Sequence, residues 1–211
     1  MPKQEAPLHY LQKFIPAPAT PLILEYLQRY KVHLTITRER KTVLGDYRHA
    51  TGFKTHRISV NGNLNPYAFL ITLVHELAHL VTFLEFGHRV QAHGREWKKL
   101  YAFLLKDFLG KQIFPQPVEK ALTASLHNLP ASSCADENLI RILKQYDLRQ
   151  NGLVMVEQLP EGQLFDIGGG RVFKKGKKLR KRFQCTEVKT GKVYLFSPVY
   201  EVKEFAERKT G

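Results

Sequence analysis

His75-Glu76-Leu77-Ala78-His79 is the stretch of this chain that decides its fold. These residues form an H-E-x-x-H pattern inside an apolar segment, 67–86, that contains no proline or glycine. Residues four apart lie on one face of a helix, so the pattern predicts that both imidazoles point at one metal ion. Glu76 is rotated by about 100° around the helix and can reach the open side of such an ion as a general base for bound water.

An amphipathic helix with two histidines on a polar stripe is the plainer alternative. It fits this segment less well, because Leu73 and Val74 precede the pattern and Leu80 and Val81 follow it. Two histidines and a glutamate among apolar neighbours are costly to bury without a partner. The flanking residues therefore favour a metal site.

A catalytic zinc site uses three protein ligands and keeps a fourth position for water. The candidates for the third ligand follow the helix in sequence: Glu85, His88, His93 and Glu96. We favour His93, because Gly87 can end the helix and the stretch 88–92 lets the chain turn back. Gly94 then lets the backbone approach the site closely. Glu85 is expected to remain in the helix, His88 in an exposed turn, and Glu96 to face solvent or to orient a ligand histidine.

The residues around this helix predict a mixed α+β arrangement. Apolar spacing indicates helices over 22–30 and 95–109, and β-rich alternation indicates strands over 32–37, 42–49 and 56–60. Asn65 is expected to cap the central helix, with Pro66 at its first position. Gly45 is expected to mark a bulge or a close approach. We expect residues 57–60 to form an edge strand beside the helix that could pair with an extended peptide.

The chain beyond residue 112 changes in character. Residues 113–150 begin with a proline-rich stretch and predict a linker with short helices over 118–126 and 137–146. Residues 151–205 predict a basic β-rich region with strands over 164–167, 171–174, 179–188 and 192–202. Thr190-Gly191 predicts a hairpin turn that pairs 181–188 with 192–198. Residues 1–20 predict an irregular lead-in, and residues 206–211 a tail.

The chain carries a formal net charge of +14. Part of this charge is concentrated in residues 171–183, which contain no acidic residue. Such a balance commonly reports a polyanionic partner, and the plainer alternatives are a solvated basic surface or attraction to anionic lipid. We favour a nucleic acid, with DNA as the expected partner, bound through the cations of this segment: Arg171, Lys174, Lys175, Lys177, Lys178, Arg180, Lys181 and Arg182. The aromatic residues Phe173, Phe183 and Tyr194 are expected to form the small β core.

Composition bounds the remaining possibilities. At 211 residues, of which 43% are hydrophobic, the chain can form one domain or two small ones with a real core. Cys134 and Cys185 are its only cysteines and give no disulfide framework, which fits a reducing compartment. Residues 1–20 lack the regions of a signal peptide, and polar residues interrupt the run 67–86. We therefore expect a cytoplasmic protein without a membrane span.

Two motifs in order carry a resemblance to a known family: H-E-L-A-H at 75–79 and H-G-x-x-W at 93–97. With Gly45-Asp46-Tyr47 and Ile58-Ser59-Val60-Asn61 upstream, they resemble the SprT family, which includes the Spartan-type DNA–protein crosslink proteases. The resemblance covers roughly residues 20 to 112. It implies a compact zincin domain over 21–112 in which His75, His79 and His93 bind one zinc ion and Glu76 is the catalytic base. Many members also carry a zinc ribbon of four cysteines, which two cysteines cannot build.

Together these observations predict an α+β protein in which a small β-sheet packs on the H-E-x-x-H helix and a second helix, followed by a small β-rich region without a four-cysteine zinc ribbon. We expect a zinc metalloendopeptidase whose protein substrates are associated with or crosslinked to DNA. The alternative is a nucleic-acid-binding or transcription-associated factor that uses the zincin scaffold with little or no proteolysis. The intact Glu76 argues against this alternative.

Overall fold

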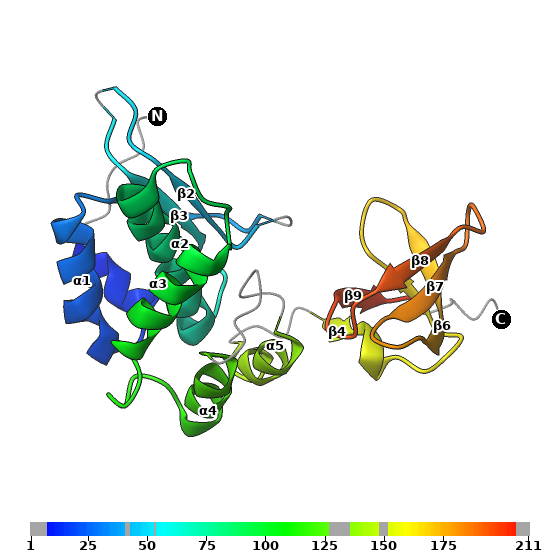
Figure 1. Ribbon diagram of the computed structural model, residues 1–211. Coiled ribbons are helices and arrows are strands. Elements are labelled where there is room, and N and C mark those ends of the chain that lie inside the picture. Colours follow the sequence, from blue (N-terminus) through cyan, green and yellow to red (C-terminus); the bar gives the residue numbers. More distant parts are fainter. Residues whose placement is uncertain (1–7, 41–42, 53, 127–135, 148–151, 206–211) are drawn as a thin grey trace. The chain divides into compact units, whose positions relative to one another are not determined.

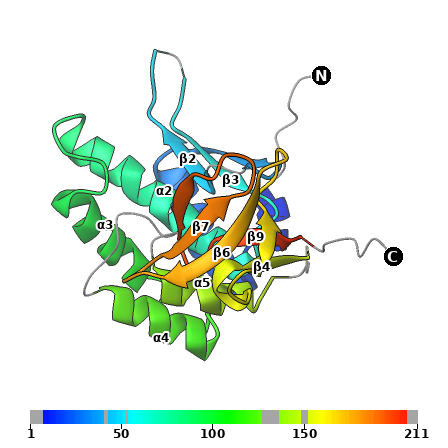
Figure 2. The same ribbon diagram turned by 90° about the vertical axis from the view of Figure 1, so that its right-hand side faces the viewer.

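The computed structural model describes residues 8–40, 43–52, 54–126, 136–147 and 152–205. The chain divides into two compact units, residues 1–147 and 148–211, which are described one at a time (Figure 1 and Figure 2). Helices and sheets both occur, so the predicted mixed α+β class is confirmed. The predicted tail, 206–211, lies outside the described residues.

The first unit contains a three-stranded sheet. Its strands are β1 (His33–Thr37), β2 (Gly45–Arg48) and β3 (Arg57–Asn61), in the spatial order β1-β3-β2. β3 runs parallel to β1 and antiparallel to β2. The predicted edge position of residues 57–60 is therefore wrong, because ladder hydrogen bonds on both sides leave β3 no free edge for another strand. The edges of this sheet are β1 and β2.

Helix α2 (Pro66–Phe86) carries the H-E-x-x-H pattern and packs against β2 and β3. As predicted, Asn65 caps it, since its side-chain oxygen accepts a hydrogen bond of 2.9 Å from the Ala68 N–H. Gly87 ends the helix with a φ of 60°, a left-handed conformation that suits glycine. By length and composition α2 could cross a membrane, but 67% of that stretch is buried inside the protein, as in a core helix.

The second predicted helix of this unit is α3 (Arg95–Lys106), which packs against α2 (Figure 1). Its buried side chains are Trp97, Tyr101, Leu104 and Leu105. They recur at helical spacing and form one apolar face, which lies in the core of the unit. Trp97 comes three residues after Gly94, the glycine that precedes the helix, so the chain that enters α3 is held against that core.

The core of the first unit extends beyond the predicted boundaries at residues 21 and 112. On the N-terminal side, η1 (Leu8–Lys13) and η2 (Ala17–Ala19), which precede α1 (Thr20–Arg29), contribute buried residues to it, among them Leu11 and Ala19. On the C-terminal side, α4 (Gln116–Ser125) and α5 (Glu137–Lys144) contribute Val118 and Leu139. Residues 113–147 thus contain the two predicted short helices, but their apolar faces pack on the first unit instead of forming a linker.

The second unit is a six-stranded antiparallel sheet. Its strands are β4 (Leu153–Met155), β5 (Leu164–Asp166), β6 (Val172–Lys178), β7 (Phe183–Glu187), β8 (Val193–Phe196) and β9 (Glu201–Glu204), in the order β4-β9-β5-β6-β7-β8. β7 and β8 form the predicted hairpin around Gly191. The predicted strand over 192–202 is two strands, because Pro198 lies between β8 and β9 and has no N–H for the ladder. Phe165, Phe173 and Cys185 are fully buried in the core of this unit.

Candidate metal centre

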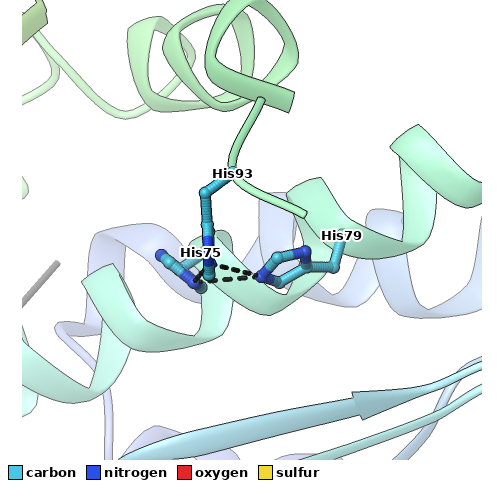
Figure 3. A group of neighbouring side chains, drawn as sticks. All are labelled: His75, His79 and His93. Carbon is cyan, nitrogen blue, oxygen red and sulfur yellow. Dashed lines mark hydrogen bonds between the residues drawn. The ribbon is translucent and has the colours of Figure 1, made fainter. Parts of the chain in front are cut away.

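Three histidines of the first unit converge on one point (Figure 3). His75 and His79 come from successive turns of α2, and His93 comes from the connection between α2 and α3. The Nε2 atom of His75 is 3.1 Å from that of His93 and 3.1 Å from that of His79, and the Nε2 atoms of His79 and His93 are 3.0 Å apart. The structure thus brings together the three residues that were predicted to share a metal ion.

Hydrogen bonding does not account for this triangle. A neutral imidazole nitrogen is either a donor or an acceptor, so three nitrogens cannot all pair with one another. In any assignment of protons, two donors or two acceptors face each other at about 3 Å. A cation at the centre removes this conflict, because all three lone pairs can point at it.

The three nitrogens fit a zinc ion. Zinc–nitrogen bonds in proteins measure about 2.0–2.1 Å, and three atoms 3.0–3.1 Å apart can all lie at that distance from one common point. Imidazole suits zinc and several other transition metals, so the donor set does not select the metal by itself. Within the part of the chain that the structure describes, this is the one group of three or more potential metal ligands.

Burial keeps the three imidazoles neutral, which is the form that binds a metal. Desolvation, with a smaller contribution from the neighbouring histidines, lowers the pKa of His75 to about 3. Desolvation and the proximity of His93 lower the pKa of His79 to about 4. The pKa of His93 is also lowered, first by burial and then by the charge of Lys98. At neutral pH all three side chains therefore offer a lone pair.

Trp97 packs against all three rings of the triangle. Its ring centroid lies 4.6 Å from that of His75, 5.2 Å from that of His79 and 4.7 Å from that of His93. Tyr101, one turn further along α3, stacks on Trp97 at 4.8 Å. The indole is fully buried, so the three imidazole rings pack against it from the interior of the protein.

Glu76 lies buried beside the triangle, in contact with β2. Its carboxyl has a pKa raised to about 8, because burial and the charge of Asp46 outweigh Arg40 and a hydrogen bond from the Tyr47 backbone N–H. A divalent cation nearby would favour the charged carboxylate and lower that pKa again. Gly45 makes the contact possible, since a Cβ there would lie 2.6 Å from Glu76 Oε1. The predicted close approach at Gly45 is therefore present.

The other candidates for the third ligand lie elsewhere. Glu85 is exposed on α2, and Glu96 is half-buried in the first turn of α3. The ring of His88 contacts those of His49 and Phe83 at 5.0 and 5.2 Å. None of them belongs to the group formed by the three converging histidines.

Sequence reasoning missed a polar network that holds β2 in place. Arg40 donates to Asn61 Oδ1 at 2.8 Å and to Ser59 Oγ at 3.0 Å. The Asn61 side chain in turn donates to the carbonyl oxygens of Arg40 and Val43. This network ties the chain between β1 and β2 to the central strand. No local pattern around residue 40 signals it, because its partners lie about twenty residues away.

The basic residues predicted to bind nucleic acid are not equivalent. Lys175 is buried, its Nζ donates to the carbonyl oxygens of Glu157 and Leu159, and it lies over the Phe183 ring, so it is not available for a phosphate. Arg171 pairs with Glu187 at 2.7 Å. The remaining six side chains are exposed: Lys174, Lys177, Lys178, Arg180, Lys181 and Arg182.

Comparison with known proteins finds a similarity within the first unit. Residues 20–112 match the model of the SprT-like family, whose members are metal-dependent and metallopeptidase-like. Neither the curated proteins nor the solved structures contain a match to this chain. The matched segment begins at the first residue of α1 and ends beyond α3, so it contains the sheet, α2 and all three converging histidines. Residues 20–112 of this chain therefore match the SprT-like family.

Proposed function

We propose that the first unit is a zincin-type metalloendopeptidase. The observation that carries the proposal is the triangle of Nε2 atoms of His75, His79 and His93, with the buried carboxyl of Glu76 on the adjacent helix position. These three imidazoles would hold one zinc ion, which when bound acts as a Lewis acid and lowers the pKa of water.

Glu76 would supply the proton transfers of the reaction. Its carboxylate accepts a proton from the water that attacks the peptide carbonyl carbon, and then delivers that proton to the nitrogen of the leaving amine. The burial of Glu76 suits this role, because burial raises the pKa of the carboxyl, and a carboxyl with a raised pKa takes up the transferred proton more readily than an exposed one does.

The free edge of β2 would hold the substrate chain. β2 is an edge strand of its sheet and packs against α2, and Gly45 on it lies against Glu76. An extended peptide could pair with this edge by β-addition and bring one of its peptide bonds to Glu76. This role replaces the one that was predicted for residues 57–60.

Glu76→Gln tests the proposal. The amide cannot accept the proton, so hydrolysis of a protein substrate such as casein should fall by a factor of about 10²–10⁴, while the zinc content by elemental analysis stays at one ion per chain. Glu85→Gln is the matched control, because Glu85 is an exposed carboxylate on the same helix. Undiminished hydrolysis by Glu76→Gln would refute the role of Glu76, and zinc retained by His93→Ala but lost from His88→Ala would refute the ligand set.

We also propose that the second unit binds DNA, so that the natural substrates are proteins associated with or crosslinked to DNA. The support is the group of six exposed cations on β6 and on the connection to β7. Phosphate binding would make the affinity fall steeply with salt concentration. A salt titration of binding to a DNA duplex tests this, and a slope near zero would contradict it. We further propose that the protein works in the cytoplasm, where a reducing environment suits the free, buried thiol of Cys185.

A further inference from the structure

Five rings gather one helical turn beyond the metal-binding histidines, and neither the metal centre nor Glu76 uses them. They belong to Tyr47, His49, His56, Phe83 and His88, and we call them the ring cluster. Phe83 is its centre, since the rings of the other four all lie within 6.4 Å of it.

Phe83 continues the metal-binding face of α2. His75, His79 and Phe83 are four residues apart, so their side chains lie on one face of the helix, one turn after another. A turn advances about 5.4 Å along the helix axis. The ring cluster therefore begins next to the metal centre, on the same side of the helix.

β2 connects the same two places. At its start Gly45 touches Glu76 and Thr72 of α2, and the ring of Tyr47 lies 6.4 Å from that of Phe83. Just beyond its end His49 stacks on Phe83, with ring centroids 4.7 Å apart and an angle of 23°. The strand thus runs beside α2 from the catalytic carboxyl to the ring cluster.

The rings of the cluster are partly exposed, and two of them have imidazole nitrogens without a hydrogen-bond partner in the described parts of the chain. His88 is exposed, and His49 and Phe83 are half-buried. In the described parts of the chain no hydrogen bond is recorded for the imidazoles of His49 and His88, whereas His56 accepts from the Ala50 N–H and lies 2.9 Å from the Tyr47 hydroxyl. The cluster therefore presents ring faces and free imidazole nitrogens to a ligand.

We propose that the ring cluster is a substrate subsite that selects an aromatic or large apolar side chain close to the cleaved bond. The proposal rests on the peptidase function proposed above. A peptide paired with β2 advances about 3.3–3.4 Å per residue, and Phe83 lies about 10 Å along the helix from Glu76, so the selected side chain is within about three residues of the cleaved bond. Aromatic rings favour such side chains through stacked and edge-to-face contacts.

Packing between the end of β2 and the end of α2 is the competing explanation of the cluster. A packing role predicts that loss of the Phe83 ring changes stability and slows all peptides alike. A subsite predicts that the loss changes the ratio between peptides. The ratio of kcat/KM values therefore separates the two explanations, because folding defects cancel in it.

The experiment uses the full zinc-loaded chain and a mixture of peptides that differ at one position, which carries Phe, Leu, Lys or Gly and is moved along the peptide. Mass spectrometry of the competing peptides gives kcat/KM ratios. The wild-type protein should prefer Phe or Leu over Gly by about tenfold or more at one position within three residues of the cleaved bond.

The variant Phe83→Ala should reduce that ratio of kcat/KM values to near one. Phe83→Leu, which keeps most of the volume, should lower the Phe-to-Leu ratio and serves if the alanine variant does not fold. Leu84→Ala is the control, because Leu84 is an exposed neighbour outside the cluster and its loss should leave all ratios unchanged.

Each outcome decides a different question. Hydrolysis without any preference, or a preference that survives both substitutions at Phe83, overturns the subsite and leaves the peptidase function standing. Equal slowing of all peptides by Phe83→Ala assigns the cluster to packing. Absence of hydrolysis of every peptide and protein by the zinc-loaded wild type overturns the peptidase function itself, and the subsite with it.

Discussion

Gly45→Ala tests the geometry of the site more directly than removal of a functional group. The added Cβ would lie 2.6 Å from Glu76 Oε1, 2.8 Å from Glu76 Cγ and 2.8 Å from Thr72 Cγ2. Ordinary contact begins near 3.4 Å, so Glu76 or β2 must move by roughly 0.6–0.8 Å. Because Glu76 is buried, it has little room to turn away.

The expected effect has two parts. Overpacking of this kind costs about 1–3 kcal/mol of folding free energy, which lowers the Tm by roughly 2–4 °C per kcal/mol in a protein of this size. A displacement of the general base by somewhat under 1 Å should lower kcat by about 10- to 100-fold. Zinc binding should persist, because the atoms that the Cβ would meet belong to Glu76 and Thr72 and not to a histidine.

The assay combines kcat on a peptide, Tm by calorimetry and zinc content. Thr72→Ser is the matched partner, since serine lacks the clashing Cγ2 but keeps the hydroxyl that donates to the Ala68 carbonyl at 2.8 Å. In a double-mutant cycle, Gly45→Ala with Thr72→Ser should recover part of both losses, whereas Thr72→Ser alone should cost little. Full activity and unchanged Tm in Gly45→Ala would refute the close approach of β2 to Glu76. Losses that Thr72→Ser does not reduce at all would refute the contact between Gly45 and Thr72.

Three further predictions concern the ligands, pH and charge. His93→Ala leaves two imidazoles and should weaken zinc binding by at least about 100-fold in a chelator competition. In the metal-free protein, burial lowers the pKa of His75 to about 3 and that of His79 to about 4, whereas both histidines of the unfolded chain take up protons below about pH 6.5. The free energy of unfolding, measured in urea, should therefore fall between pH 6.5 and 4 by up to about 1.4 kcal/mol per pH unit for each histidine. A constant free energy of unfolding over this range would contradict the burial of these rings. Lys175→Met should lower the free energy of unfolding by about 1–3 kcal/mol, because two carbonyl oxygens lose their donor, and should leave the salt dependence of DNA binding unchanged. Lys181→Gln, at an exposed position, should leave the stability unchanged. It should reduce the slope of log affinity against log salt concentration by up to about 0.9.

The parts of the fold that could be predicted have local signals. Helix α2 begins and ends at the expected residues, with Asn65 and Pro66 at its start and Gly87 after its last residue. Helix caps can be predicted because they depend on the backbone within a few positions. The β7–β8 hairpin follows from the turn at Gly191 for the same reason. The order β1-β3-β2 has no such signal, since strand neighbours are decided by contacts between distant segments. This is why residues 57–60 could be predicted as a strand but were placed wrongly at the edge.

The same distinction explains why the sequence carries no signal for the burial of Lys175 or for the docking of α4 and α5 on the first unit. No local pattern within 171–183 distinguishes Lys175 from the other lysines. Its burial depends on two carbonyl oxygens, sixteen and eighteen residues away in the sequence. Similarly, the sequence predicts α4 and α5 as helices, but their packing depends on an apolar surface formed by the rest of the first unit. Helical spacing predicts an apolar face and does not say what covers it.

Gly45 combines a local sequence signal with a contact to a distant residue, and its substitution therefore tests both. A glycine within a β-rich stretch signals a close approach from sequence alone, but its partner, Glu76, becomes known only when β2 is placed at the edge and beside α2. If the double-mutant cycle shows coupling between residues 45 and 72, the same result places the start of β2 against α2, one turn before Glu76. If it shows none, β2 does not lie against α2 at this point, and both the substrate edge and the ring cluster lose the strand that connects them to the metal centre.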